Sequence, residues 1–496
     1  MKKRRKATAA GDRRALALSV ALASACSPEV EPTIEAEAEV ETEAEVDPHA
    51  EARERLAAFE HARREAAEFA TIPASDGRFG ADPYQLIALP DGRVAGLLRG
   101  DDRVVLFDRG GAPTGSAATV HDPTDLAWRD GELWVVGTGE ARIARYRVSD
   151  GLEPNGHIEL AEAFAPRAIA VGPDAVFVAD ERGRLHVLRD DGPVLVVDRH
   201  CRGPLALELV DDRLLLANCL LDHRIRIDRL DGDALVELGA ITHDGPIWSF
   251  ASGPELDGER LLALTGVEDR PLDRSDGGFG YVDSFVFVYA LGLDGDSLEI
   301  TRRATINVSE LGVVTPKWSR WLAVEQPAIE LAGYATAELL RLRFVDGLAA
   351  APIVERSAGL PGTTAVVELA DRSLLAANPL LDGWLRLGPE TSHPRDGMVL
   401  PTDAKRPAVA AGMAEIRFEL LPVDDDRDDR SFAERLGEAL VFTTAMAPQN
   451  SAEGQRSRFT CETCHFEGRG DGRTHFTGRE RDGQRIHATS KPLLGL

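Results

Sequence analysis

The residues with the most specific chemistry in this sequence are two cysteines and a histidine near its end. Cys461, Cys464 and His465 have the spacing Cys-x-x-Cys-His. Two thiols at this spacing can add to the two vinyl groups of a haem, and the adjacent imidazole can reach the iron. The pattern therefore predicts one covalently bound haem c per chain, with His465 as the proximal iron ligand.

Two other kinds of site also use closely spaced cysteines. A zinc site would need further ligands, which His475 and His487 could supply. A thioredoxin-like redox pair would need a βαβ setting, whereas the residues that lead into the motif have a helical pattern. Haem is therefore the favoured interpretation.

The sequence does not determine which residue is the sixth ligand of the iron. No methionine follows Cys461, so the candidates are His475 and His487 downstream and Met446 upstream. We take His475 first, although a surface histidine in a glycine-rich loop explains it equally well. Two histidine ligands would favour a lower reduction potential than histidine with methionine.

The remaining cysteines fall into two groups. Cys26 lies at the end of an N-terminal apolar stretch, whereas Cys201 and Cys219 lie within one repeat of the middle region. If Asp211 and Asp212 form the turn between them, the strand register does not place Cys201 opposite Cys219. A disulfide and two separate buried thiols therefore both remain open.

The first 26 residues have the pattern of an export signal. A basic start is followed by the apolar stretch 15–25, which is too short for a membrane-spanning helix of about 20 residues. The run Leu22-Ala-Ser-Ala-Cys26 resembles a bacterial lipobox, which implies cleavage and lipidation at Cys26. Its leucine lies four residues before the cysteine, where the family pattern has it three before, so plain secretion is the alternative. Both interpretations place the protein in the periplasm or cell envelope of a bacterium.

Two further segments precede the main domain. Residues 27–48 alternate Glu with Ala, Val and Thr, and they have too little apolar surface to offset the entropy of ordering. We expect them to form a disordered acidic tether. Residues 49–75 contain few large apolar side chains, so we expect a marginal helix or a continuation of the linker.

Residues 76–422 repeat an apolar strand, a turn with Asp or Gly, and further strands. The units are spaced by about 40 residues, a period typical of four-stranded propeller blades. This pattern predicts a mainly β fold, a seven-bladed β-propeller, with six or eight blades as alternatives. One unit is longer because it contains Val267–Asp283, which we expect to be a loop insertion. The units begin near Gln85, Thr124, Arg167, Pro204, Ile247, Trp318 and Thr364.

Residues 431–496 follow the propeller as a separate module. Residues 423–430 are acidic but lack the glycine and the twelfth-position glutamate of a calcium-binding EF-hand, so we expect a solvated hinge. Ser431 and Glu434 have the spacing of a capping box, and the apolar stripe after them predicts a helix over about 432–444. The sequence therefore predicts a small α-helical, cytochrome c-like module after the propeller.

The module resembles a known family. The run 435–442, the haem motif, Gly468–His475 and Lys491–Gly495 resemble haem modules of the di-haem cytochrome c peroxidase and MauG-like superfamily. The blades resemble soluble propellers of bacterial envelope proteins, some of which are fused to cytochrome modules. In the peroxidase family the module is one of a pair. This sequence has no second Cys-x-x-Cys-His, so we expect a monohaem form or part of a longer di-haem protein.

Charge and composition limit the function classes. The formal net charge is −26 and the sequence pI is about 4.9. An acidic surface repels phosphate backbones, so nucleic acid is not an expected partner. No nucleophilic triad, phosphate loop or paired carboxylate set is recognisable, so the sequence assigns no catalytic residue.

These observations favour an electron-transfer function. The propeller would act as a docking scaffold, and the partner would be a redox protein or a small-molecule electron donor or acceptor. One alternative is part of a peroxidase-like enzyme whose second haem lies elsewhere. The other is a non-catalytic binding propeller with a vestigial haem tail. Contact with a membrane is expected only through the lipid at Cys26.

Overall fold

The chain divides into two compact units, Met1–Pro48 and His49–Leu496, and all residues with a described position belong to the second unit. The predicted signal segment, the lipidation site Cys26, the tether 27–48 and the acidic hinge lie outside the described residues, as does the linker 49–75 apart from residue 53. The computed structural model describes residues 53, 81–189, 194–231, 234–269, 282–295, 297–322, 326–336, 338–358, 361–380, 382–388, 398–399, 418–422, 432–444, 457–469, 474–481 and 484–489.

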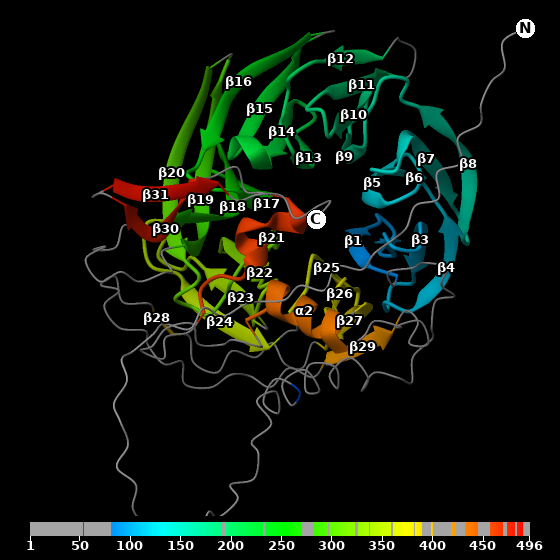
Figure 1. The fold of residues 1–496 in the computed structure, drawn as a ribbon. Helices are drawn as coiled ribbons and strands as arrows, with labels where there is room; N and C mark the ends of the chain where they lie inside the picture. Colours follow the sequence, from blue (N-terminus) through cyan, green and yellow to red (C-terminus); the bar gives the residue numbers. More distant parts are fainter. Residues whose placement is uncertain are drawn as a thin grey trace, which may run out of the picture. The chain divides into compact units, whose positions relative to one another are not determined.

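Seven antiparallel sheets form the blades of a β-propeller, arranged around a common axis (Figure 1). Blade 1 contains β1 (Pro83–Ala88), β2 (Val94–Leu98), β3 (Arg103–Phe107) and β4 (Pro113–Ala118). Blade 2 contains β5 (Pro123–Arg129), β6 (Glu132–Gly137), β7 (Glu140–Val148) and β8 (Leu152–Glu159). Blade 3 contains β9 (Pro166–Val171), β10 (Ala175–Asp180), β11 (Leu185–Arg189) and β12 (Leu195–Val197). Blade 4 contains β13 (Pro204–Val210), β14 (Leu214–Cys219), β15 (Arg224–Asp231) and β16 (Ala234–Thr242).

The last three blades are less regular. Blade 5 contains β17 (Ile247–Leu256), β18 (Glu259–Asp269), β19 (Val282–Asp294) and β20 (Ser297–Asn307). Blade 6 contains β21 (Trp318–Leu322), β22 (Ala328–Ala332), β23 (Glu338–Arg343) and β24 (Ile353–Ala358), with the short β28 (Met398–Val399) added at its edge. Blade 7 contains β25 (Ala365–Glu368), β26 (Leu374–Asn378), β27 (Gly383–Leu387) and β29 (Phe418–Pro422).

The predicted repeat is confirmed. Each predicted unit start lies at, or within two residues of, the first residue of an innermost strand, from β1 to β25. The long unit is blade 5, but Val267 and Asp283 belong to β18 and β19 rather than to a loop. The insertion prediction was therefore too wide at both ends, because β18 and β19, with 11 and 13 residues, are longer than the middle strands of the other blades.

Hairpin turns of the blades use residues that tolerate a left-handed backbone. Asp130 and Gly131 join β5 to β6 with φ of 50° and 87°, and Asp257 and Gly258 join β17 to β18 with 55° and 81°. Two consecutive positive φ values are what a tight two-residue hairpin with the natural strand twist requires. The Asp-Gly pairs at these hairpin turns therefore determine where the flanking strands end.

Packing between side chains of the first and last blades closes the ring. Strand β1 contacts β5 on one side and β25 on the other. Trp384 of β27, only 1% exposed, lies in one core cluster with residues of β1, β2 and β3. Its ring meets the ring of Phe107 edge-on, with centroids 5.1 Å apart. Among the described strands, no strand is shared between blades 1 and 7, so the ring is closed by this apolar contact together with hydrogen bonds such as Asp82 N–H to Asp382 and Thr364 Oγ1 to the Tyr84 carbonyl.

Cys201 and Cys219 are joined by a disulfide, with Cα atoms 5.1 Å apart. Strand register does not pair them, as expected, because Cys219 lies opposite Pro204. Cys201 lies in the loop before β13, and both cysteines are buried in the core shared by blades 3 and 4. Loop geometry, which the strand register does not describe, therefore brings the two sulfurs together.

The C-terminal residues depart from the predicted α-helical module. Helix α2 (Phe432–Phe442) agrees with the predicted helix, and α3 (Cys461–Cys464) and the 3-10 turn η4 (Phe466–Gly468) follow. The next elements are β30 (Thr474–Arg481) and β31 (Gln484–Thr489), an antiparallel pair, so the module is not purely helical. Asp482-Gly483, a common hairpin turn sequence, lies between them.

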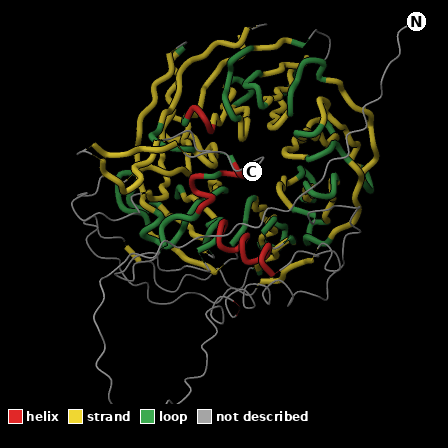
Figure 2. Tube along the Cα trace, viewed as in Figure 1, coloured by secondary structure: helices red, strands yellow, loops and turns green. Residues whose placement is uncertain are grey.

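Figure 2 shows how little helix accompanies the strands of the described residues. Within these residues, none of the helices has the length and apolar character needed to cross a membrane.

We expect Trp384→Ala to lower the free energy of unfolding by about 3–5 kcal/mol, since it removes a large buried side chain at the contact that closes the ring. Phe164, with 51% of its surface exposed, offers a control. Phe164→Ala should cost less than about 1 kcal/mol. Urea denaturation of both variants measures the difference, and equal losses would contradict ring closure by this packing.

Candidate functional site

The innermost strands of five blades carry a β-bulge at their second residue. In β1, for example, Pro83 pairs with Leu98 and Gln85 with Leu97, so Tyr84 is the extra residue. A bulge of this kind turns one side chain away from the regular alternation of the strand. The bulge residues are Tyr84, Thr124, Arg167, Leu205 and Trp248. Together with Arg99 and Lys317 we call them the axial mouth.

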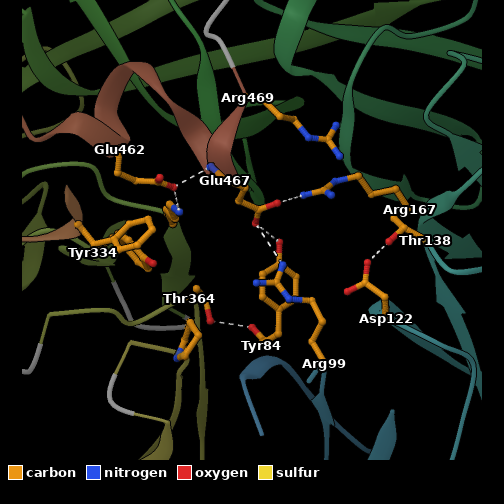
Figure 3. Close-up of a pocket in the computed structure, with 13 residues that line it drawn as sticks. Tyr84, Arg99, Asp122, Thr138, Arg167, Tyr334, Thr364, Glu462, Glu467 and Arg469 are labelled. Carbon is orange, nitrogen blue, oxygen red and sulfur yellow. Dashed lines mark hydrogen bonds and ion pairs between the residues drawn. The ribbon is translucent and has the colours of Figure 1, made fainter. Parts of the chain in front are cut away.

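Segment 457–469, which contains the Cys-x-x-Cys-His motif, packs against the axial mouth. In Figure 1 its red-orange ribbon lies beside the inner strands β17 and β21. Most of its contacts with the propeller come from Glu462, Thr463, Phe466 and Glu467, as Figure 3 shows in part.

Glu467 makes the central contact. One carboxylate oxygen accepts a hydrogen bond from the Tyr84 hydroxyl at 2.6 Å and lies 3.6 Å from an Arg99 nitrogen. The other oxygen accepts a charge-assisted hydrogen bond from Arg167. The carboxylate thus bridges residues of blade 1 and blade 3 (Figure 3).

The charges around Glu467 decide its protonation state. Burial alone would raise the pKa of this carboxyl, but the positive charges of Arg167, Arg99 and Lys317 outweigh burial and hold the pKa well below its usual range. Burial, followed by the nearby Glu467 charge, raises the pKa of the Tyr84 hydroxyl. At neutral pH the pair is therefore a carboxylate and a neutral phenol, with the phenol as donor.

Glu462 makes a second buried ion pair. Its side chain is 1% exposed and accepts a hydrogen bond from the Lys317 ammonium, which comes from the residue before β21. The same oxygen of Glu462 accepts the backbone N–H of Glu467 at 3.0 Å, so the two acidic residues are joined in one compact turn. Next to them, the Thr463 hydroxyl lies 2.9 Å from the Thr315 hydroxyl.

Phe466 supplies the apolar contact of the segment. Its ring, 3% exposed, lies in a buried cluster with Trp248, Leu220 and Val267. The Lys317 ammonium lies 4.4 Å from the centre of the Phe466 ring, a cation–π contact. The segment therefore meets an apolar side of the mouth with an aromatic ring and a cationic side with two carboxylates.

Two more ion pairs hold the ends of the segment. Arg458 donates to the Asp283 carboxylate, with a nitrogen–oxygen distance of 3.0 Å, just after the start of β19. Arg469 donates two hydrogen bonds of 2.6 Å to the Glu181 carboxylate, beyond the end of β10. Paired parallel bonds of this type fix orientation as well as distance.

A cavity of about 380 Å³ remains beside the segment. One buried oxygen of Glu462 at this end of the segment has no hydrogen-bond partner among the residues that the structure describes. Tyr334 stands between Phe442 and Lys317, whose ammonium lies 3.8 Å from the centre of its ring. The lining is mainly polar and comprises Tyr84, Arg99, Asp122, Thr138, Arg167, Lys317, Tyr334, Thr364, Pro379, Phe442, Glu462, Glu467 and Arg469.

The predicted haem ligands flank the two residues of the motif that contact the propeller. Cys461 is exposed and Cys464 is partly buried. His465 is partly buried, and its Nδ1 is buried without a hydrogen-bond partner among the described residues. The intervening Glu462 and Thr463 are fully buried against the propeller.

These donors fit a covalently attached haem. The first cysteine and the histidine are four residues apart on one turn, where the His465 N–H donates to the Cys461 carbonyl at 2.9 Å. Side chains three and four residues apart share one face of a helix, so the two thiols and the imidazole can approach one porphyrin. The spacing of the three donors on this turn is compatible with a covalent haem, and the haem assignment stays a prediction.

The candidate sixth ligands are not brought to the motif by any described contact. His475 and His487 belong to β30 and β31, where the backbone is described but the side chains are not. Met446 lies outside the described residues. In the described part of the chain, no three His, Cys, Asp or Glu side chains gather as a metal site.

Sequence reasoning missed the residues that hold the motif. Glu462 and Glu467 lie in and beside it, and Tyr84 and Arg167 start inner strands, but nothing local marks them as partners. The available signal was the recurrent Pro-x at the starts of β1, β5, β9 and β13. The x position is the bulge residue in each of these four strands.

Asp125, next to a bulge residue, is a buried carboxyl with a raised pKa. It accepts hydrogen bonds of 2.9 Å from the backbone N–H groups of Leu126 and Ile169, and so links blades 2 and 3. Burial raises its pKa to about 7, against the opposing effect of these hydrogen bonds and of Arg167.

No family model matches the chain, and no curated protein matches it. Among solved structures, a streptogramin B lyase is 16% identical with a TM-score of 0.44, covering 61% of this chain and 92% of its own. The virginiamycin B lyase from Staphylococcus aureus is 14% identical with a TM-score of 0.42, covering 62% and 94%. The WD40 repeats of RRP9 are 11% identical with a TM-score of 0.43, covering 62% and 92%. The seven-bladed assignment rests on the strands themselves, and the resemblance of residues 431–496 to di-haem peroxidases stays a prediction.

We expect Glu467→Gln to lower the free energy of unfolding by about 1.5–3 kcal/mol, because it removes the charge of the carboxylate that Arg99 and Arg167 share. The two arginines keep Asp82 and Glu181 as counter-charges. Glu368→Gln is the matched control. Glu368 is more exposed, and its partner Arg320 keeps a second carboxylate, Glu330. Its loss should stay below about 1 kcal/mol. Chemical denaturation compares the two, and equal small losses would show that the Glu467 contact is not a buried ion pair.

We expect Asp125→Asn to flatten the pH dependence of stability between pH 5 and 7. A carboxyl with a raised pKa keeps a proton in the folded state that the unfolded chain releases, so the free energy of unfolding falls as pH rises from about 4 to about 7. Denaturation at several pH values measures both slopes. Asp371→Asn serves as the control, because a hydrogen bond from Ser373 lowers the pKa of Asp371, which stays ionised over this range. Unchanged slopes in the Asp125 variant would contradict the raised pKa.

Proposed function

We propose that the protein is an exported haem c-binding protein that transfers single electrons. One observation carries the proposal: Glu462 and Thr463, the two variable residues of the motif, are buried against the propeller, whereas Cys461 is exposed and Cys464 and His465 are only partly buried. A motif that served only to attach the segment would not need two thiols and an imidazole on the remaining face.

In this proposal, some residues of the chain bind the cofactor and others fix the segment on the propeller. Cys461 and Cys464 hold the porphyrin by its edge, and His465 binds the iron. Glu467 and Phe466 fix the segment on the propeller, so that the cofactor would sit in a constant place. Haem c, when bound, supplies a one-electron redox centre.

The proposed partner follows from charge. A protein with a formal net charge of −26 attracts cationic molecules over long range. A redox protein with a basic docking face, or a cationic small-molecule donor or acceptor, would therefore encounter this chain fastest, and the rate would fall as salt is added. The proposed location is the bacterial cell envelope, with a lipid at Cys26.

Expression with export and haem-attachment machinery tests the proposal. The mature protein should show a c-type absorption spectrum when reduced, and mass spectrometry should find one haem on the peptide that contains Cys461 and Cys464. Replacing both cysteines by alanine should remove the covalent haem. The matched control replaces Cys201 and Cys219, the disulfide pair, and should retain it. A mature wild-type protein without tetrapyrrole would refute the proposal.

A further inference from the structure

The cations of the axial mouth are held in place by the propeller itself. Arg99 donates to the Asp82 carboxylate at 2.6 Å, and its guanidinium lies 4.1 Å from the centre of the Tyr84 ring. Arg167 lies 3.5 Å from a Glu181 oxygen. Lys317 lies over the Tyr334 ring. These contacts involve no residue of segment 457–469, so the mouth keeps its shape without it.

Repeated backbone bulges place the side chains of the axial mouth. Five inner strands each insert one extra residue at the same place, and the inserted side chains differ in chemistry. Tyr84 and Arg167 give a polar side, whereas Leu205 and Trp248 give an apolar side. A bulge interrupts the strand ladder, and its usual role is to aim a side chain.

The segment is complementary to both sides of the mouth. Glu462, Phe466 and Glu467 form one compact turn, in which Glu467 has a left-handed φ of 48°. The two carboxylates meet Lys317, Arg99 and Arg167, and the ring meets Trp248. Preorganised charges on one side and a short acidic-aromatic turn on the other are the features of a receptor and its ligand.

We propose that the axial mouth is a binding site for an acidic-aromatic peptide, and that segment 457–469 of this chain is its resident ligand. The propeller recognises two carboxylates separated by one turn with a phenylalanine between them. This recognition does not require haem, so it stands apart from the proposed electron transfer. The mouth accepts the same turn from a separate peptide once the chain's own segment has been displaced.

The experiment uses full-length protein with Glu462→Lys and Glu467→Lys, which places like charges against Lys317, Arg99 and Arg167 and expels the segment. The probe is a labelled synthetic peptide of residues 457–469 with serine at both cysteine positions. Fluorescence anisotropy should show at least tenfold tighter binding to this variant than to wild type, whose mouth is occupied. A peptide that also carries Glu462→Gln and Glu467→Gln should bind at least tenfold more weakly. Equal binding of both peptides, or no binding to the folded variant, overturns the proposal.

A second measurement keeps the test decisive if the double variant does not fold. In wild type and in Phe466→Ala, hydrogen exchange of residues 457–469 is compared with that of the inner strand β9. The variant should exchange at least tenfold faster in the segment and be unchanged in β9. Equal protection of the segment in both proteins overturns the proposal. Haem content, read by absorption in the same samples, reports on the electron-transfer proposal alone.

Discussion

The position of the C-terminal segment depends on one buried carboxylate. Glu467 lies two residues after His465 and contacts Tyr84 and Arg99 of blade 1 and Arg167 of blade 3. Buried ion pairs gain little net free energy over apolar contacts, because both charges lose their hydration. Their strength lies in geometry, since a carboxylate with several fixed donors has one low-energy place. Glu467 therefore contributes strongly to where the Cys-x-x-Cys-His turn sits on the propeller, together with the ion pairs of Glu462, Arg458 and Arg469.

The propeller architecture can be predicted from the sequence because the patterns that indicate its strands and turns lie within short stretches of the chain. Alternating apolar residues and Asp or Gly turns recur with each blade, and strand pairs join neighbours in the chain. The disulfide between Cys201 and Cys219 was not decidable in this way, because Cys201 lies in a loop. The β30–β31 pair was missed for a different reason. Asp482-Gly483 is a common hairpin turn sequence, but the resemblance to a haem module predicted helices in this region instead.

The candidate site likewise has one part that local sequence reveals and another part that it does not. Cys461, Cys464 and His465 are recognisable from five consecutive residues, whereas their anchors are distributed over the whole chain. Tyr84 and Glu467 are 383 positions apart, and Arg167 and Glu467 are 300 apart. Such pairs follow from bulge geometry and blade order, neither of which a single sequence records. The motif is therefore recognisable from local sequence, whereas its contacts with the propeller are not.

The order of strands in blade 7 has a consequence for how the ring is completed. Strand β27 pairs with β29, yet β28 intervenes in the chain and joins blade 6 instead. In any folding intermediate that lacks β29, the edge of β27 presents unpaired backbone groups, and such edges promote aggregation. Blade 7 therefore cannot form from one continuous stretch of chain, and its completion depends on residues that follow the edge strand of blade 6.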